Sequence, residues 1–199
     1  MMSNAAEEVA ATAARLIVEE GMEYGAAKRK AARDLGRRSG RGAELPSNEA
    51  LEDEVRAYIE LFCADTQPAE LHALRGVALL WMQRLAEFRP HLAGAVWRGT
   101  ATRQSAVQLD LYCDDPKAAE IMVINAGVDY DVASIARAGG EPVNVLLVAS
   151  RSEALGEWVT VQLALYDRDD QRGALKPDSR GRSWRGDLAA LQKLMAVAP

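Results

Sequence analysis

The chain has 199 residues, a formal net charge of -5 at pH 7, and a composition of 49% hydrophobic and 27% charged residues. These proportions are those of globular proteins, so they exclude a disordered or fibrous chain, and the negative charge excludes a protein that is basic over its whole surface. The longest apolar-rich stretch, residues 76–82, is far shorter than the ~20 residues that span a bilayer, so we expect no membrane span.

Residues 1–90 repeat their apolar side chains at the 3.6-residue period of helices, and we predict about four helices there. Glycines and prolines mark where these helices end and begin, and residues 37–46, rich in glycine and charge, predict a mobile loop. The first predicted helix ends at Gly21, the second covers about residues 24–35, the third starts at Ser47 or Asn48 and reaches Phe62, and the fourth runs from Pro68 towards Pro90.

The apolar period changes from 3.6 to 2 at Pro90, which predicts a helical region over residues 1–90 and an α+β domain over residues 91–199. Asp115 and Pro116 predict the start of one short helix, and a final helix is expected over residues 186–197. The predicted strands cover residues 92–98, 106–113, 143–149 and 158–167, with a weaker one at 128–133. The fold class predicted is therefore α+β, with N-terminal helices packed on a mixed sheet of four to five strands with flanking helices.

Several common kinds of active site are missing from the sequence. The only two histidines, His72 and His91, have no partner nearby, and no H-x-x-x-H or C-x-x-C spacing suggests zinc. No glycine-rich loop of the Walker or dinucleotide-binding type occurs. Cys63 and Cys113 are far apart, and the N-terminus lacks a secretory pattern, so we expect a cytoplasmic protein with reduced thiols.

Residues 96–112 carry the strongest chemical pattern of the chain. A predicted strand enters a turn at Gly99 and Thr100, and a second strand follows with Gln108 and Asp110 two residues apart. A glycine lets backbone approach a phosphate, hydroxyl and N–H groups hold its oxygens, and side chains two apart share one strand face. This segment resembles the signature of the polymerase-β-like nucleotidyltransferase superfamily, in which a Gly-Ser or Gly-Thr turn precedes a strand with Asp-x-Asp.

The resemblance implies a nucleotide site with Mg²⁺ held by carboxylates. It makes Asp110 a candidate catalytic and metal-binding residue, but Gln108 replaces an expected acid. A third acid is expected on strand 158–167, whose polar face carries only Thr160, Gln162 and Tyr166 before Asp167 at its end. The candidate nucleotide- and phosphate-binding residues are Gly99, Thr100, Arg98 and Arg103. We therefore predict a nucleotidyltransferase-like protein with impaired metal binding that recognises a nucleotide or RNA; an ion pair with a nearby arginine is the alternative for Asp110.

A wider resemblance links the chain to a group of small proteobacterial proteins, through Glu20-Gly21 and residues 27–32 and 163–176. Some of these carry a Mur-ligase label, but a Mur ligase needs an ATP phosphate loop and three domains, which this sequence does not provide. The label therefore adds nothing to the predicted function.

A second candidate site is the basic run on the second helix and the loop after it. Such a run can contact phosphates of a nucleic acid, or it can be a solvated helix face. The candidate nucleic-acid-binding residues are Lys28, Arg29, Lys30 and Arg33, continued by Arg37, Arg38 and Arg41. The alternative function is thus a regulatory module that binds nucleic acid or protein without catalysis.

Residues 166–173 mix both signs of charge and predict a loop at a sheet edge or the rim of a site.

Overall fold

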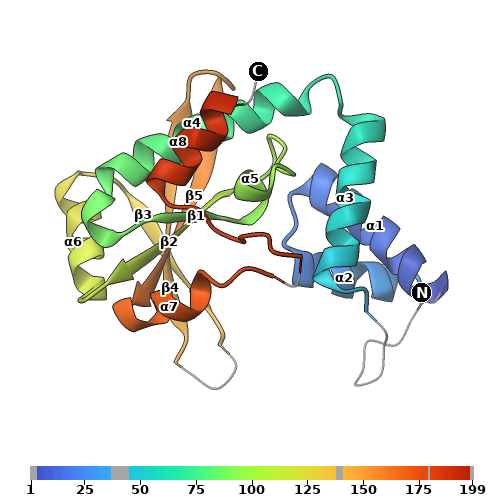
Figure 1. Ribbon diagram of the computed structural model, residues 1–199, viewed down its shortest axis with the longest axis horizontal. Helices are drawn as coiled ribbons and strands as arrows, with labels where there is room; N and C mark the ends of the chain where they lie inside the picture. The colour runs from blue at the N-terminus through green and yellow to red at the C-terminus, as the bar shows by residue number, and fades with distance from the viewer. Residues whose placement is uncertain (1–3, 37–44, 138–140, 179, 198–199) are drawn as a thin grey trace. The chain divides into compact units, whose positions relative to one another are not determined.

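The computed structural model of the protein describes residues 4–36, 45–137, 141–178 and 180–197 (Figure 1). The chain divides into two compact units, which are Met1–Glu70 with Thr100–Ser105 and Leu71–Gly99 with Ala106–Pro199. Most of the loop predicted over residues 37–46, including Arg37, Arg38 and Arg41, lies outside the described residues. No described helix is long and apolar enough to cross a membrane.

The first unit is built from α1 (Asn4–Glu20), α2 (Tyr24–Asp34) and α3 (Asn48–Phe62), which confirms the first three predicted helices. The side chain of Ser47 accepts a hydrogen bond from the Ala50 N–H and caps α3, as its residue type predicts. Helix α1 packs against both α2 and α3 (Figure 1). The buried side chains of this core are small on α2 and larger on α1 and α3: Ala27, Ala31, Ala32, Val9, Leu16, Ile17, Leu51, Val55 and Ile59.

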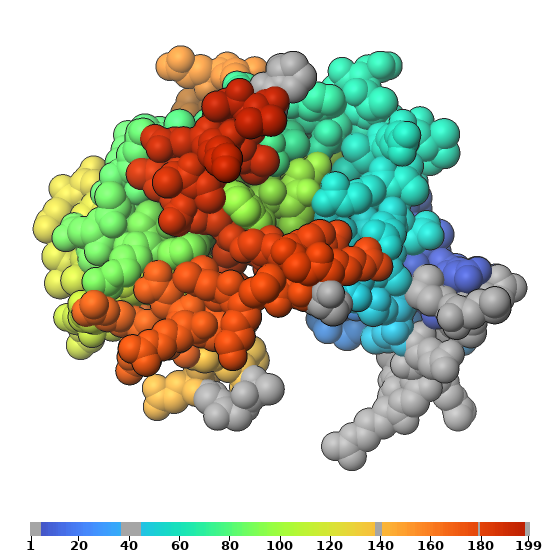
Figure 2. Space-filling model, viewed as in Figure 1, coloured from blue at the N-terminus to red at the C-terminus, as the bar shows by residue number. Residues whose placement is uncertain are grey.

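Helix α4 (Gln67–Arg84) is the fourth predicted helix, and it is followed by the 3₁₀ turn η1 (Ala86–Phe88). Pro90 lies at the change from helices to strands. The remaining helical segments of the second unit are short: α5 (Gly94–Arg98), α6 (Pro116–Asn125), the 3₁₀ turn η2 (Arg168–Asp170), α7 (Gln171–Ala174) and α8 (Leu188–Val197). Asp115 caps α6 by accepting a hydrogen bond from the Lys117 N–H, as predicted. In the space-filling view α7 and α8, coloured orange and red, lie on the outside of the second unit (Figure 2).

The sheet of the second unit has five strands in the order β1-β2-β5-β4-β3, which confirms the predicted mixed sheet and the α+β fold class. The strands β2 and β5 are parallel, and the other neighbours are antiparallel. The strands are β1 (His91–Ala93), β2 (Val107–Cys113), β3 (Tyr130–Ile135), β4 (Val143–Ser152) and β5 (Glu157–Asp167). Strand β3 forms one edge and is exposed along most of its length.

The strand predicted over residues 92–98 is wrong beyond Ala93, because helix α5 begins at Gly94. Gly94 has φ +67°, a left-handed conformation that ends the extended strand. Helix α5 then places the side chain of Val96 in the core. A short apolar run fits a buried strand and a buried helix equally well, so periodicity alone could not separate the two.

The alternation along β2 is the feature of the fold that positions the site. Val107, Leu109 and Leu111 are fully buried on one face, and Gln108 and Asp110 lie on the other, as predicted for a strand. Strand β5 alternates in the same way except at Ala164, which is buried like both its neighbours, so β2 and β5 present one apolar and one partly polar face.

Candidate functional site

The polar face of β2 lies beside the polar face of β5. The parallel register places Gln108 opposite Gln162, Asp110 opposite Ala164, and Tyr112 opposite Tyr166. This confirms that the strand predicted over residues 158–167 runs beside the strand of Gln108 and Asp110. Asp110 is the only acid among these six residues. The position two residues earlier on the same face is a glutamine on both strands, Gln108 on β2 and Gln162 on β5.

A glycine turn does face this polar surface, but it is the turn at Gly94. Ala93 pairs with Gln108 in the antiparallel register of β1 and β2, and a Cβ added to Gly94 would lie 2.4 Å from the Gln108 Oε1. The left-handed glycine therefore lets the backbone pass closely over Gln108. This turn is absent from the prediction because residues 92–98 fit a single strand; a strand that ends at the glycine would have identified it.

We predict that Gly94→Ala lowers the free energy of unfolding. The left-handed backbone alone should cost about 1–2 kcal/mol, and the contact of the new Cβ with Gln108 should add to this cost. Gly127 is a matched control, since its φ is +66° and an added Cβ would meet no atom within 4 Å. Urea unfolding of both alanine variants, with and without Gln108→Ala, measures the difference. Equal costs for Gly94→Ala and Gly127→Ala would contradict the close approach of Gly94 to Gln108.

The carboxylate of Asp110 forms an ion pair with Arg185, whose Nε donates a hydrogen bond to its Oδ2. Side-chain exposure is 9% for Asp110 and 26% for Arg185. Burial raises the pKa of Asp110, and the hydrogen bond and positive charge of Arg185 act in the opposite direction. The alternative predicted for Asp110, an ion pair with an arginine, is therefore what the structure contains.

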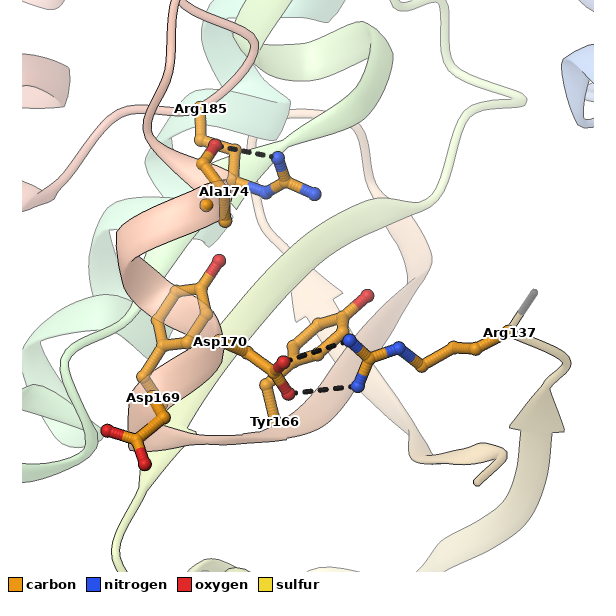
Figure 3. A pocket seen from close by; sticks show the side chains of 8 residues that line it. Arg137, Tyr166, Asp169, Asp170, Ala174 and Arg185 are labelled. Atoms are coloured by element: carbon orange, nitrogen blue, oxygen red, sulfur yellow. Dashed lines mark hydrogen bonds and ion pairs between the residues drawn. The ribbon is translucent and has the colours of Figure 1, made fainter. Parts of the chain in front are cut away.

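The chain around Arg185 holds the guanidinium in place. Its Nη1 donates to the Ala174 carbonyl at 3.0 Å, at the end of α7 (Figure 3). The next residue, Gly186, exchanges two backbone hydrogen bonds with Leu92 at 2.8 and 3.0 Å. A Cβ on Gly186 would lie 2.1 Å from the Trp97 ring, so Arg185 is anchored through a tight backbone contact on its C-terminal side.

A pocket of about 350 Å³ opens beside this ion pair (Figure 3). It lies where β2 and β5 end and η2 and α7 begin. The rings of Tyr112 and Tyr166 stack in it, with their centroids 5.7 Å apart and an interplanar angle of 26°. The lining residues are Tyr112, Arg137, Tyr166, Asp169, Asp170, Gly173, Ala174 and Arg185. The mixed-charge segment 166–173, predicted to be a loop or the rim of a site, thus lines a pocket.

The two arginines that line the pocket are already paired with carboxylates. Arg137 donates two hydrogen bonds of 2.9 Å to the two carboxylate oxygens of Asp170, and its guanidinium lies 5.9 Å from the centre of the Tyr166 ring. The hydrogen bond from Arg137 lowers the pKa of Asp170. The Asp169 carboxylate points away from both arginines (Figure 3). Each arginine of the pocket is therefore matched by one carboxylate.

The two tyrosines offer polar groups that remain free in this part of the structure. Burial, followed by the charge of Asp110, raises the pKa of both Tyr112 and Tyr166, so both phenols are protonated at neutral pH. Neither hydroxyl has a hydrogen-bond partner among the described residues. A ligand in the pocket would thus meet the neutral hydroxyl of the half-buried Tyr166, with that of the buried Tyr112 behind it, and each can donate and accept.

The predicted phosphate-binding residues belong to different units. In the second unit, Gly99 ends α5 with φ +83°, and the Arg98 guanidinium lies 5.4 Å from the centre of the Trp184 ring. In the first unit, the buried hydroxyl of Thr100 has no partner among the described residues, and the Arg103 N–H donates to Glu70 at 2.9 Å. The role of these four residues stays a prediction.

The basic residues of α2 are partly engaged within the first unit. The Lys28 ammonium donates to the Pro46 carbonyl and to Asn48 Oδ1, both at 2.7 Å, and Lys30 forms an ion pair with Glu20 at 2.7 Å. Arg29 and Arg33 are exposed. Contact of these four side chains with nucleic acid stays a prediction.

The residues on the polar face do not fit Mg²⁺. A two-metal phosphoryl-transfer site needs several carboxylates on one face, and the nearest positions here are Gln108, Gln162 and the ion-paired Asp110. Across residues 4–36, 45–137, 141–178 and 180–197, no group of three or more His, Cys, Asp or Glu side chains could hold a metal ion. No reaction step through Mg²⁺ follows from this site.

Neither the models of known protein families nor the curated proteins give a match to this sequence. Among solved structures, the chain is similar to the structure of Cid1 in complex with the UTP analogue UMPNPP, with a TM-score of 0.36 and 12% sequence identity. The likeness covers 57% of this chain and 37% of that chain, so this chain spans little more than a third of its length. No family, substrate or activity follows from this likeness.

Proposed function

We propose that this chain is a nucleotidyltransferase-like protein with impaired metal binding, which recognises a nucleotide without transferring it. The observation that carries the proposal is the Asp110–Arg185 ion pair on the polar face of β2. The carboxylate that the superfamily resemblance assigns to a metal is buried against a guanidinium, and a carboxylate so paired is a poor ligand for a second cation.

Arg185 supplies a fixed positive charge at the position where a cation would otherwise meet Asp110. Nucleotidyl transfer relies on positioning and on metal ions that neutralise the charge developing on the phosphates. A guanidinium tied to Asp110 and to the Ala174 carbonyl neutralises the acid, but it cannot activate an attacking hydroxyl as a metal does. This supports recognition without transfer.

The pocket beside Asp110 supplies groups suited to a nucleotide. Tyr166, which is half-buried, offers part of its ring and a polar end, which is how aromatic side chains commonly meet a base, and the buried Tyr112 packs behind it. The rival function, a nucleic-acid-binding module based on α2, has less support because Lys28 and Lys30 already bond within the first unit.

We expect ribonucleoside triphosphates to bind with dissociation constants that change less than about twofold between Mg²⁺ and EDTA, because one ion-paired carboxylate cannot hold the usual metal ions. Isothermal titration calorimetry with the full chain measures this. Incubation with Mg²⁺, a triphosphate and an oligonucleotide acceptor should give no extended product. Binding seen only with Mg²⁺, or extension of the acceptor, would overturn the proposal.

A further inference from the structure

We infer that the pocket of Tyr112, Tyr166, Arg137 and Arg185 takes an uncharged, ring-shaped ligand of the nucleoside or free nucleobase class, and gives no net binding energy to a phosphate. The inference rests on the proposed function and names the ligand class of the same site. Three properties of the pocket carry it: its charge, its polar groups and its size.

The charge balance argues against a phosphate in this pocket. Nη1 and Nη2 of Arg137 each donate a hydrogen bond to one carboxylate oxygen of Asp170, and Nε of Arg185 donates to Asp110. A phosphate could use either guanidinium only by displacing its carboxylate, and it would then meet that carboxylate as a like charge. The gain from a new charge-assisted pair is therefore cancelled by the loss of the old one.

The free polar groups match the edge of a base. The hydroxyls of Tyr112 and Tyr166 can each donate and accept, and Nη2 of Arg185 makes no hydrogen bond with a described residue. Bases carry donors and acceptors side by side along their edges, as these groups require. Because one face of Tyr166 meets Tyr112 and its ring also meets Arg137, we expect the base to contact ring edges as well as the hydroxyls.

The size of the pocket also favours a nucleoside or free base over a nucleoside triphosphate. Its volume of about 350 Å³ is at the small end of the range of about 300–1,000 Å³ for ligand pockets. Such a pocket suits a base with part of its sugar better than a whole nucleoside triphosphate. Phosphates attached to such a ligand would lie at the rim of the pocket, where the side chain of Arg137 is 42% exposed.

Calorimetry with ribonucleosides and with their triphosphates tests the inference on the full chain. We expect a nucleoside and its triphosphate to bind within about threefold of each other, with little change between low and high salt, because no counterion release accompanies an uncharged contact. Tyr166→Ala should weaken both ligands about tenfold, as expected for the loss of one ring contact with a base.

A matched pair of variants tests the charge argument. Asp170→Asn leaves Arg137 without its carboxylate and should strengthen triphosphate binding about tenfold, the value of one charge-assisted hydrogen bond, while nucleoside binding stays the same. Asp129→Asn removes the same charge from an exposed side chain that does not line the pocket, and it should change neither. Urea unfolding of each variant confirms that it is folded.

The outcomes separate this inference from the proposed function. If the wild-type chain binds triphosphates much more tightly than nucleosides, the proposed function stands and this inference is wrong. Equal behaviour of Asp170→Asn and Asp129→Asn would also overturn it, because the pairing of Arg137 would then not limit phosphate binding. If neither nucleosides nor triphosphates bind, both the inference and the proposed function fail.

Discussion

Arg185→Met is expected to lower the free energy of unfolding by about 3 kcal/mol, because it leaves Asp110 buried without a partner. This value is the lower end of the range for buried pairs, since a quarter of the Arg185 side chain remains exposed. The loss of the hydrogen bond to Ala174 acts in the same direction. Equilibrium unfolding in urea measures the change.

Two further variants make this result specific. The double variant Asp110→Leu with Arg185→Met should recover most of the stability, because replacing both ions with apolar groups is often neutral. Arg168→Met removes a surface pair with Asp114, in which the two side chains are 58% and 69% exposed, and should cost only about 0–1 kcal/mol. If Arg185→Met costs no more than Arg168→Met, the pair with Asp110 is not a buried one.

Gly186→Ala is expected to destabilise the protein by about 3 kcal/mol, the upper end of the usual range for overpacking. The new Cβ would lie 2.1 Å from the Trp97 ring, which is itself held by a hydrogen bond from its Nε1 to the Ser183 carbonyl. Either the ring must move or the bridge between Gly186 and Leu92 must open. Opening of the bridge displaces Arg185, which directly precedes Gly186, so ligand binding in the pocket should then weaken together with stability.

The control for this variant is Gly76→Ala on α4, where an added Cβ meets nothing within 4 Å. There the substitution should stabilise the helix by about 0.5–1 kcal/mol, because alanine loses less chain entropy than glycine. The double variant Trp97→Leu with Gly186→Ala should be more stable than the sum of the two single changes predicts. Strict additivity of the two changes would show that ring and backbone do not meet.

Local signals were enough to predict most elements of this fold. Ser47 and Asp115 predict the starts of α3 and α6, because a capping side chain accepts a hydrogen bond from a backbone N–H two or three residues later. The alternation along β2 is local too, and it assigns Asp110 to the polar face. Residues 92–98 were the exception. A three-residue strand followed by a five-residue helix is too short to show either the period of 2 of a strand or the period of 3.6 of a helix.

The partners within the site could not be predicted in this way. Arg185 follows Asp110 by 75 positions, and Arg137 and Asp170 are 33 apart. No spacing rule links side chains that meet only through the folded sheet. The sequence identified Asp110 and the charged segment around Asp170, while the choice of arginine for each acid depends on the course of the chain after β5.

The parallel pairing of β2 with β5 has a consequence for the order of assembly. Strands β4 and β5 are joined by the short turn at Gly156, so they can pair at a low cost in chain entropy. Val107 of β2 meets Val161 of β5 only after the intervening chain, with α6, β3 and β4, has been closed into a loop. Arg185 lies further still along the chain, and its contact with Asp110 requires β2 to be in the sheet. The two charged residues of the site, Asp110 and Arg185, are thus brought together by contacts between distant positions in the sequence, after the β4–β5 hairpin beside them.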